Sequence, residues 1–255
     1  RARSGRPGGC RGDAVGASTR VELDGIDLVV FDKDGTLIDF HAMWSGWVEG
    51  LADELEEATG LPLRRPLFAM MGYDPGSHRA YPGGGLISTP MARLRESTAE
   101  VLATEGLAAG RIETVLGAAW RAPDPVSLAH PLTDLEALLG GLRTAGRRVA
   151  VATSDDREPT LRTLRALGIE GLVDAVVCAD DGPAVKPAGA AIEHLCATLE
   201  VPADRSAVVG DAPADLAMGR AAGAALVIGV LSGVGSRDDL AGADLLIESV
   251  ADLHA

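Results

Sequence analysis

The chain has 255 residues, of which 47% are hydrophobic and 3% aromatic, so it can bury one sizeable α/β domain with a smaller insertion and is not a disordered protein. Its net charge of −14 disfavours nucleic acid and anionic membranes as partners, because both would be repelled. No long uncharged apolar run predicts a transmembrane helix, and three scattered cysteines without a CxxC pair favour the reducing cytoplasm over a disulfide framework or a zinc site.

Residues 1–20 are rich in Gly, Arg and Ser and contain no apolar stretch, so we expect a disordered tail outside the fold. Beyond them, six short and continuous apolar runs predict buried parallel strands. These runs are 26–31, 148–153, 174–179, 206–211, 225–230 and 243–248.

Amphipathic segments alternate with these runs from residue 132 onwards, at 132–146, 158–169, 188–200 and 213–223. The first has leucines on one helical face and Gly146 as a candidate C-terminal cap. Regular alternation of strand and helix predicts the α/β class, with a Rossmann-like doubly wound parallel sheet.

Residues 38–131 interrupt this alternation. They contain helical patterns at 44–59, 91–105 and 112–121, and a Pro/Gly-rich stretch at 71–90 without strand alternation. We therefore predict an α-helical cap at 38–131, inserted into a core formed by 21–37 and 132–255.

The first strand ends in two acids, Asp32 and Asp34, within the segment DKDGTL. In an extended chain, residues two apart project to the same side, so these carboxylates would face the crevice beyond the sheet. They would repel each other without a shared cation, and Mg²⁺ prefers such oxygen ligands. An EF-hand loop does not fit, because Gly35 comes too early, whereas a chance acidic turn is a competing interpretation of this segment alone.

Polar residues also follow three later strands. Thr153 follows the second strand, Lys186 the third, and Asp211 the fourth, with Asp215 four residues further on. Each feature is common by itself, but the carboxyl ends of parallel strands meet at one edge, so we expect all of them to converge on one crevice.

DKDGTL, Thr153, Lys186-Pro187 and GDAPAD resemble the four motifs of the haloacid dehalogenase (HAD) superfamily. The closest resemblance is to its Mg²⁺-dependent phosphatases with a helical cap between the first two motifs, and it covers 26–255. It implies hydrolysis of a small phosphomonoester, and it favours phosphoglycolate among substrates that also include sugar phosphates and nucleotides.

The resemblance also implies residue roles. Asp32 would be the nucleophile and form an aspartyl-phosphate, and Asp34 the general acid and base. Thr153 and Lys186 would bind the phosphoryl oxygens. Mg²⁺ would be held by the Asp32 carboxylate, the Asp34 backbone carbonyl and Asp211, whereas Asp215 would orient Lys186 or the metal shell.

Residue types narrow the choice within the superfamily. Asp34 argues against the dehalogenases, which lack the second aspartate, and no Lys lies between 38 and 131 to serve a phosphonate hydrolase. A phosphosugar mutase remains an alternative, as does, from another class, an inactive binding relative. In the cap, His41 and Arg79 are candidate specificity residues, weighed against a packed hinge for His41 and an ordinary surface charge for Arg79.

Overall fold

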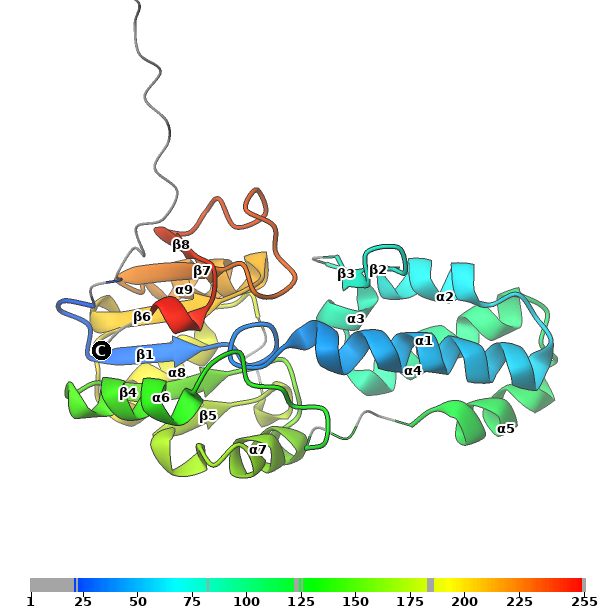
Figure 1. Cartoon of the computed structure of the whole chain (residues 1–255), viewed down its shortest axis with the longest axis horizontal. Helices are drawn as coiled ribbons and strands as arrows, with labels where there is room; N and C mark the ends of the chain where they lie inside the picture. The colour runs from blue at the N-terminus through cyan, green and yellow to red at the C-terminus, as the bar shows by residue number, and fades with distance from the viewer. Residues whose placement is uncertain are drawn as a thin grey trace, which may run out of the picture.

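A computed structural model describes residues 21, 23–81, 83–121, 124, 126–182 and 186–253, so the expected tail at 1–20 lies outside the described residues. The chain forms a core around a six-stranded sheet and a helical cap that extends from one end of that sheet (Figure 1). Within the described ranges, no helix is both long and apolar enough to cross a membrane.

The core sheet has the strand order β5-β4-β1-β6-β7-β8, and all neighbouring strands are parallel. Its strands are β1 (Leu28–Phe31), β4 (Arg148–Ala152), β5 (Ala175–Val177), β6 (Ser206–Gly210), β7 (Leu226–Val230) and β8 (Leu245–Ile247). Each lies inside an apolar run predicted as a strand. The predicted doubly wound parallel sheet is therefore confirmed.

Helices cover both faces of this sheet. Val29 and Phe31 of β1 pack toward the face covered by α6 (Leu135–Thr144) and α7 (Arg157–Ala166). The alternate residues, Leu28 and Val30, pack toward α8 (Ala190–Leu199) and α9 (Pro213–Ala222) on the other face (Figure 1). Because β1 is central and buried on both sides, its carboxyl end is a rigid position for a reactive residue.

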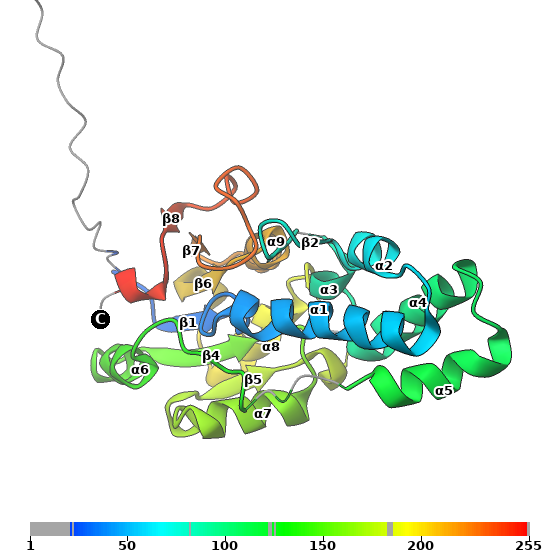
Figure 2. The same cartoon turned by 45° about the vertical axis from the view of Figure 1, so that its right-hand side comes forward.

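The cap is built mainly from α1, which runs outward from the core, with α2 and α5 packed along it and α4 packed against both of these (Figure 2). The bounds of its elements are α1 (Phe40–Thr59), α2 (Arg64–Met71), β2 (Tyr73–Asp74), β3 (Arg79–Ala80), α3 (Gly85–Ser88), α4 (Met91–Thr104) and α5 (Ala109–Ala119). The three predicted cap helices are present. The sequence interpretation missed α2 and α3, and it was wrong to find no strands in 71–90, because β2 and β3 form a short antiparallel hairpin there.

Two adjacent connections join cap and core. Ile38 and Pro131 form an antiparallel bridge, and the Leu132 amide donates to the Leu37 carbonyl at 3.0 Å. Asp39 then caps α1 by accepting hydrogen bonds from the amides of the first turn. The chain thus leaves and re-enters the core at one place.

Candidate active site

The register of the sheet brings the predicted residues together at one edge. Phe31 is aligned with Val151 on one side and with Val209 on the other. Asp32 comes one residue after this level, and Thr153 and Asp211 come two residues after it, so all three emerge close together beyond the carboxyl ends of β1, β4 and β6.

Four charged side chains form what we call the Asp32 cluster: Asp32, Lys186, Asp211 and Asp215. The Lys186 ammonium forms ion pairs with Asp32 and with Asp215, the latter at 2.6 Å. All four side chains are buried or nearly so. Asp215 also accepts a hydrogen bond from the Ala212 amide at 3.0 Å, so the first turn of α9 fixes its orientation.

The Asp32 cluster could hold a metal ion. One oxygen each from Asp32, Asp211 and Asp215 lies within 4.8 Å of the others, and all three residues are buried. Three carboxylates and one ammonium leave an excess of about two negative charges when all are ionised, and burying such an excess is costly without a cation. An all-oxygen donor set with this charge suits a hard divalent cation.

Electrostatics support the same conclusion. Burial raises the pKa of Asp32 to about 6, although the Lys186 ammonium acts to lower it. Burial, followed by the Asp32 and Asp215 carboxylates, raises the pKa of Asp211 well above its ordinary value. Burial acts to lower the pKa of Lys186, but Asp215 and Asp32 outweigh it, so the pKa of this ammonium is raised. The carboxylates therefore repel each other in the absence of further positive charge.

Two backbone segments enclose the Asp211 carboxylate. The Val234 amide donates to its Oδ2 at 2.8 Å, and a Cβ atom at either Gly35 or Gly233 would overlap the carboxylate. Gly35 also has a φ of +89°, which favours glycine. The Ser232 hydroxyl donates to the Gly35 carbonyl at 2.8 Å and ties the two segments together.

Thr153 is buried at the end of β4, as predicted. Its hydroxyl oxygen accepts a hydrogen bond from the Asp155 amide at 3.2 Å. Because a hydroxyl can accept and donate at once, its proton stays available for a phosphoryl oxygen.

Asp34 makes its direct side-chain contacts with Lys33, and the Asp32 carboxylate lies close enough to act on its pKa, in the direction of raising it. The chain turns immediately after β1, and the Leu37 and Ile38 amides both donate to the Lys33 carbonyl, at 2.9 and 3.1 Å. Within this turn the Asp34 carboxylate lies against the Lys33 ammonium, which also pairs with Asp155.

Lys33, Asp34 and Asp155 form a second charged group, the Lys33 cluster. The Lys33 ammonium lies 2.7 Å from both Asp34 oxygens and 3.0 Å from Asp155 Oδ2. Burial raises the pKa of Asp34 to about 7, with Lys33 acting to lower it and Asp155 to raise it. The sequence interpretation missed Lys33 and Asp155, although a lysine between two acids at the end of a buried strand was a usable signal.

The two candidate specificity residues of the cap, His41 and Arg79, contact the same backbone carbonyl of the core. Arg79 Nη2 donates to the Gly233 carbonyl at 2.7 Å, and His41 Nε2 lies 3.3 Å from the same oxygen. Burial, together with the nearby Arg79 charge, lowers the pKa of His41, while the Gly233 carbonyl acts to raise it. Both residues therefore lie at the cap–core junction, next to the glycine that contacts Asp211.

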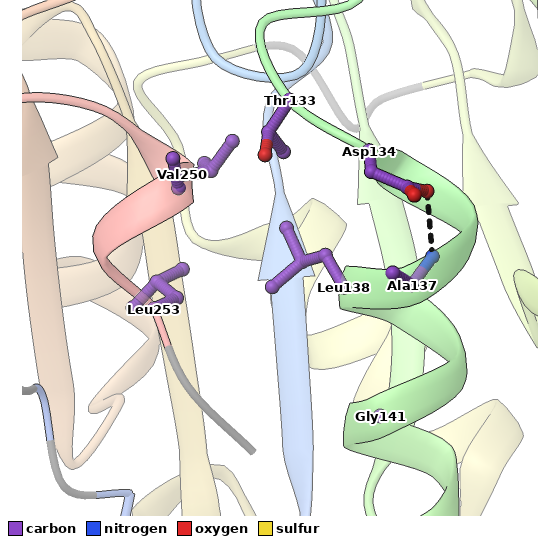
Figure 3. Close-up of a pocket in the computed structure, with 8 residues that line it drawn as sticks. Thr133, Asp134, Ala137, Leu138, Gly141, Val250 and Leu253 are labelled. Carbon is purple, nitrogen blue, oxygen red and sulfur yellow. Dashed lines mark hydrogen bonds between the residues drawn. The ribbon is translucent and has the colours of Figure 1, made fainter.

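A hollow of about 240 Å³ lies elsewhere, between α6 and the C-terminal segment (Figure 3). Its lining includes Thr133, Leu138, Val250 and Leu253, and none of the predicted site residues. It is separate from the two charged clusters.

A model of the haloacid dehalogenase-like hydrolase family matches residues 26–223 of the chain. The chain belongs to this family. The match spans both charged clusters and the cap, so the predicted superfamily is confirmed.

Curated relatives and solved structures agree with this membership. The phosphoglycolate phosphatase of Rhodospirillum rubrum is 33% identical over 203 residues, 78% of each chain. That of Chromobacterium violaceum is 29% identical over 237 residues, 92% of this chain and 97% of its own. A crystal structure from Haemophilus somnus, described as a predicted phosphoglycolate phosphatase, has a TM-score of 0.62 at 19% identity and covers 91% of this chain and 97% of its own. These findings support the predicted phosphatase activity, and the crystal structure supports the fold.

Proposed function

We propose that this HAD family member is a Mg²⁺-dependent phosphomonoester hydrolase that acts through an aspartyl-phosphate on Asp32. The convergence of Asp32 with Lys186, Asp211 and Asp215 at the carboxyl end of the central strand carries the proposal. A carboxylate beside an ammonium, with further carboxylates that fit a divalent metal, is suited to phosphoryl transfer through a covalent intermediate.

In the first step, an Asp32 oxygen attacks phosphorus and the bond from phosphorus to the substrate alcohol breaks. Asp34 gives its proton to the departing alkoxide, so the alcohol leaves neutral. Burial favours the protonated acid that this step needs, since it raises the pKa of Asp34 to about 7. Lys186 and Thr153 bind the phosphoryl oxygens and stabilise their charge.

In the second step, the Asp34 carboxylate takes a proton from water, and the resulting hydroxide attacks the phosphorus of the aspartyl-phosphate. The bond between phosphorus and Asp32 breaks, which frees phosphate and restores the Asp32 carboxylate. Asp34 ends the cycle protonated, as it began.

The metal in this proposal is held by Asp32 and Asp211, with the Asp34 backbone carbonyl as a further ligand. Asp215 orients Lys186, a role that their 2.6 Å ion pair supports. When bound, Mg²⁺ supplies the positive charge that lets an anionic ester approach three carboxylates.

We propose phosphoglycolate as the substrate. The names of the curated relatives support this choice, because those spanning most of this chain are phosphoglycolate phosphatases. Arg79 supports it chemically, since an exposed guanidinium at the cap–core junction is suited to a substrate carboxylate. His41, on the same carbonyl, would shape the same end of the pocket.

Negative net charge disfavours nucleic acid and anionic membranes as partners of this enzyme. The two described cysteines, Cys178 and Cys196, are free and buried, in keeping with the reducing cytoplasm as its location.

Phosphate release from a panel of metabolite monoesters, with Mg²⁺ or with EDTA, tests the proposal. We expect Mg²⁺-dependent release, fastest from phosphoglycolate, and loss of activity in Asp32→Asn. Asp238→Asn makes the same chemical change at an exposed position and serves as the control. Acid-quenched wild type should carry one added phosphoryl group on Asp32. Release that persists in Asp32→Asn would refute the nucleophile assignment, and transfer within a phosphosugar without net release would favour a mutase.

A further inference from the structure

The chain has 23 Lys and Arg residues, and only two of them are lysines, Lys33 and Lys186. The other members of this set are arginines. Both lysines are almost fully buried, with 2% and 8% of their side chains exposed, and each pairs with two aspartates. Lysine is very rarely buried unless it is paired, so each position needs a compact ammonium.

The two ammonium groups differ in their free donors. An ammonium has three N–H donors. Lys33 faces three carboxylate oxygens, two of Asp34 and one of Asp155, so its donors are all engaged. Among the described residues, Lys186 contacts one oxygen each of Asp32 and Asp215, which leaves one donor for a phosphoryl oxygen. Lys33 is therefore equipped to hold side chains in place rather than to bind substrate.

Asp155, the outer member of the Lys33 cluster, is itself fixed. Its amide donates to the Thr153 hydroxyl oxygen at 3.2 Å, and its carbonyl accepts from the Ala179 amide at 2.9 Å. The carboxylate that supports Lys33 thus comes from a rigid position at the end of β4. Within the described parts of the chain, Lys33 is the donor recorded for the Asp34 carboxylate.

We propose that Lys33 is a positioning residue, which Asp155 supports, that holds the Asp34 carboxylate in the orientation required for proton transfer to the leaving group. This inference rests on the proposed function, in which Asp34 is the acid and base.

The physical need for such a residue is clear from the charges. Asp32 and Asp155 both repel the Asp34 carboxylate, so its position depends on an opposing positive charge. Contact of the Lys33 ammonium with both of its oxygens holds the carboxylate in place against this repulsion. Positioning of this kind matters because small displacements of an acid reduce proton-transfer rates steeply.

Leaving-group dependence tests the proposal. An alkyl phosphate needs a proton on its leaving group, whereas p-nitrophenyl phosphate releases a stable phenolate and does not. In Lys33→Met we expect the pre-steady-state rate of alcohol release from phosphoglycolate to fall by about 10- to 100-fold, within the range of general acid catalysis, while release of p-nitrophenol changes by less than about threefold. Asp155→Asn should give a smaller loss with the same selectivity.

Two further variants control for misfolding and for the role of Asp34. Lys33→Met combined with Asp155→Asn removes one charge of each sign, so it leaves the net charge of the cluster as in wild type, and it should keep the selectivity of Lys33→Met. In an Asp34→Asn background, Lys33→Met should cause no further loss with phosphoglycolate, because the group that it positions is gone.

Equal losses with both esters, or none, would overturn the positioning role. If Asp34→Asn itself slowed both esters equally, the acid role of Asp34 would fall, and the inference with it. If wild type released phosphate from neither ester, this would refute the proposed hydrolase function itself.

Discussion

Arg79 of the cap donates a hydrogen bond to the Gly233 carbonyl of the core at 2.7 Å, and Gly233 packs directly against the carboxylate of Asp211. The cap thus contacts the core at the backbone segment that encloses a proposed metal ligand. A movement of the hairpin β2–β3 that breaks this bond would act on the loop beside the Asp32 cluster. Substrate recognition by the cap and organisation of the catalytic site therefore share one segment of backbone.

Replacing Arg79 should separate substrates by charge. In Arg79→Met we expect kcat/KM for phosphoglycolate to fall by about tenfold or more, the range of one charged hydrogen bond, and mainly through KM. 2-Hydroxyethyl phosphate, which lacks the carboxylate, should lose less than about threefold. Steady-state kinetics with both esters measure the difference. Arg93→Met, on the exposed surface of α4, is the matched control. Equal losses for the two esters would show that Arg79 does not read the carboxylate.

A methyl group at Gly233 should weaken metal binding. A Cβ atom there would overlap the Asp211 carboxylate, so Gly233→Ala must displace either the loop or the ligand. We expect the Kd for Mg²⁺, measured by isothermal titration calorimetry, to rise by about tenfold or more. Gly242→Ala adds the same group where nothing lies within 4 Å, and it should leave Kd unchanged. Unchanged affinity in Gly233→Ala would mean that Asp211 does not contribute to the metal site.

Stabilisation by Mg²⁺ should depend on pH. The folded pKa of Asp32 is about 6 and that of Asp211 is also raised, so without metal the fold holds protons that the unfolded chain has already lost. The contribution of these two groups to the free energy of unfolding is fully present at a pH below their ordinary, unfolded-state pKa. It is lost as the pH rises through their raised folded-state pKa. Because a metal ion binds the deprotonated carboxylates, its binding releases these protons, and its affinity falls at low pH.

Thermal unfolding with EDTA or Mg²⁺ should therefore show a larger gain in Tm at about pH 7.5 than at about pH 5. In Asp211→Asn, both the gain and its pH dependence should shrink. A gain that is constant with pH in wild type would contradict the raised pKa values.

The two lysines offer a spectroscopic view of both clusters. Protein labelled with ¹⁵N only at lysine Nζ should give two side-chain signals, and Lys33→Met should remove one of them. Asp155→Asn should shift the Lys33 signal and leave that of Lys186 in place, because their ion-pair partners are different residues. A Lys33 signal at the position of a freely exchanging surface lysine would contradict its burial.

The strands were predictable because each is a continuous apolar run that lies in a buried parallel sheet, and the sheet order then brought Asp32, Thr153 and Asp211 together. The hairpin β2–β3 could not be predicted, because its strands have only two residues each and lie among prolines and glycines. Strands this short show no alternation of apolar and polar residues. In α2, two arginines and Pro66 occupy the first turn and conceal a short apolar face.

The pairing of Asp34 with its neighbour Lys33 could not be predicted from spacing alone. It accompanies the turn after β1, in which the Lys33 carbonyl accepts hydrogen bonds from the Leu37 and Ile38 amides. Lys33 was overlooked for a related reason: a lone lysine usually lies in solvent, and only the packing of β4 beside β1 shows that Asp155 is there to receive it. The contact between Lys33 and Asp155 joins residues far apart in sequence, so it could not be predicted from the local pattern.

The sheet order has a consequence for how the molecule is made. β1, which presents the proposed nucleophile, pairs on one side with β4 and on the other with β6, and both lie beyond the cap in the sequence. On the ribosome, the first core strand to emerge must therefore wait, exposed and unpaired, while the whole cap is synthesised. The apolar cluster of the cap is drawn almost entirely from its own residues, so the cap is the part of the nascent chain that can collapse early, and the catalytic edge is assembled last.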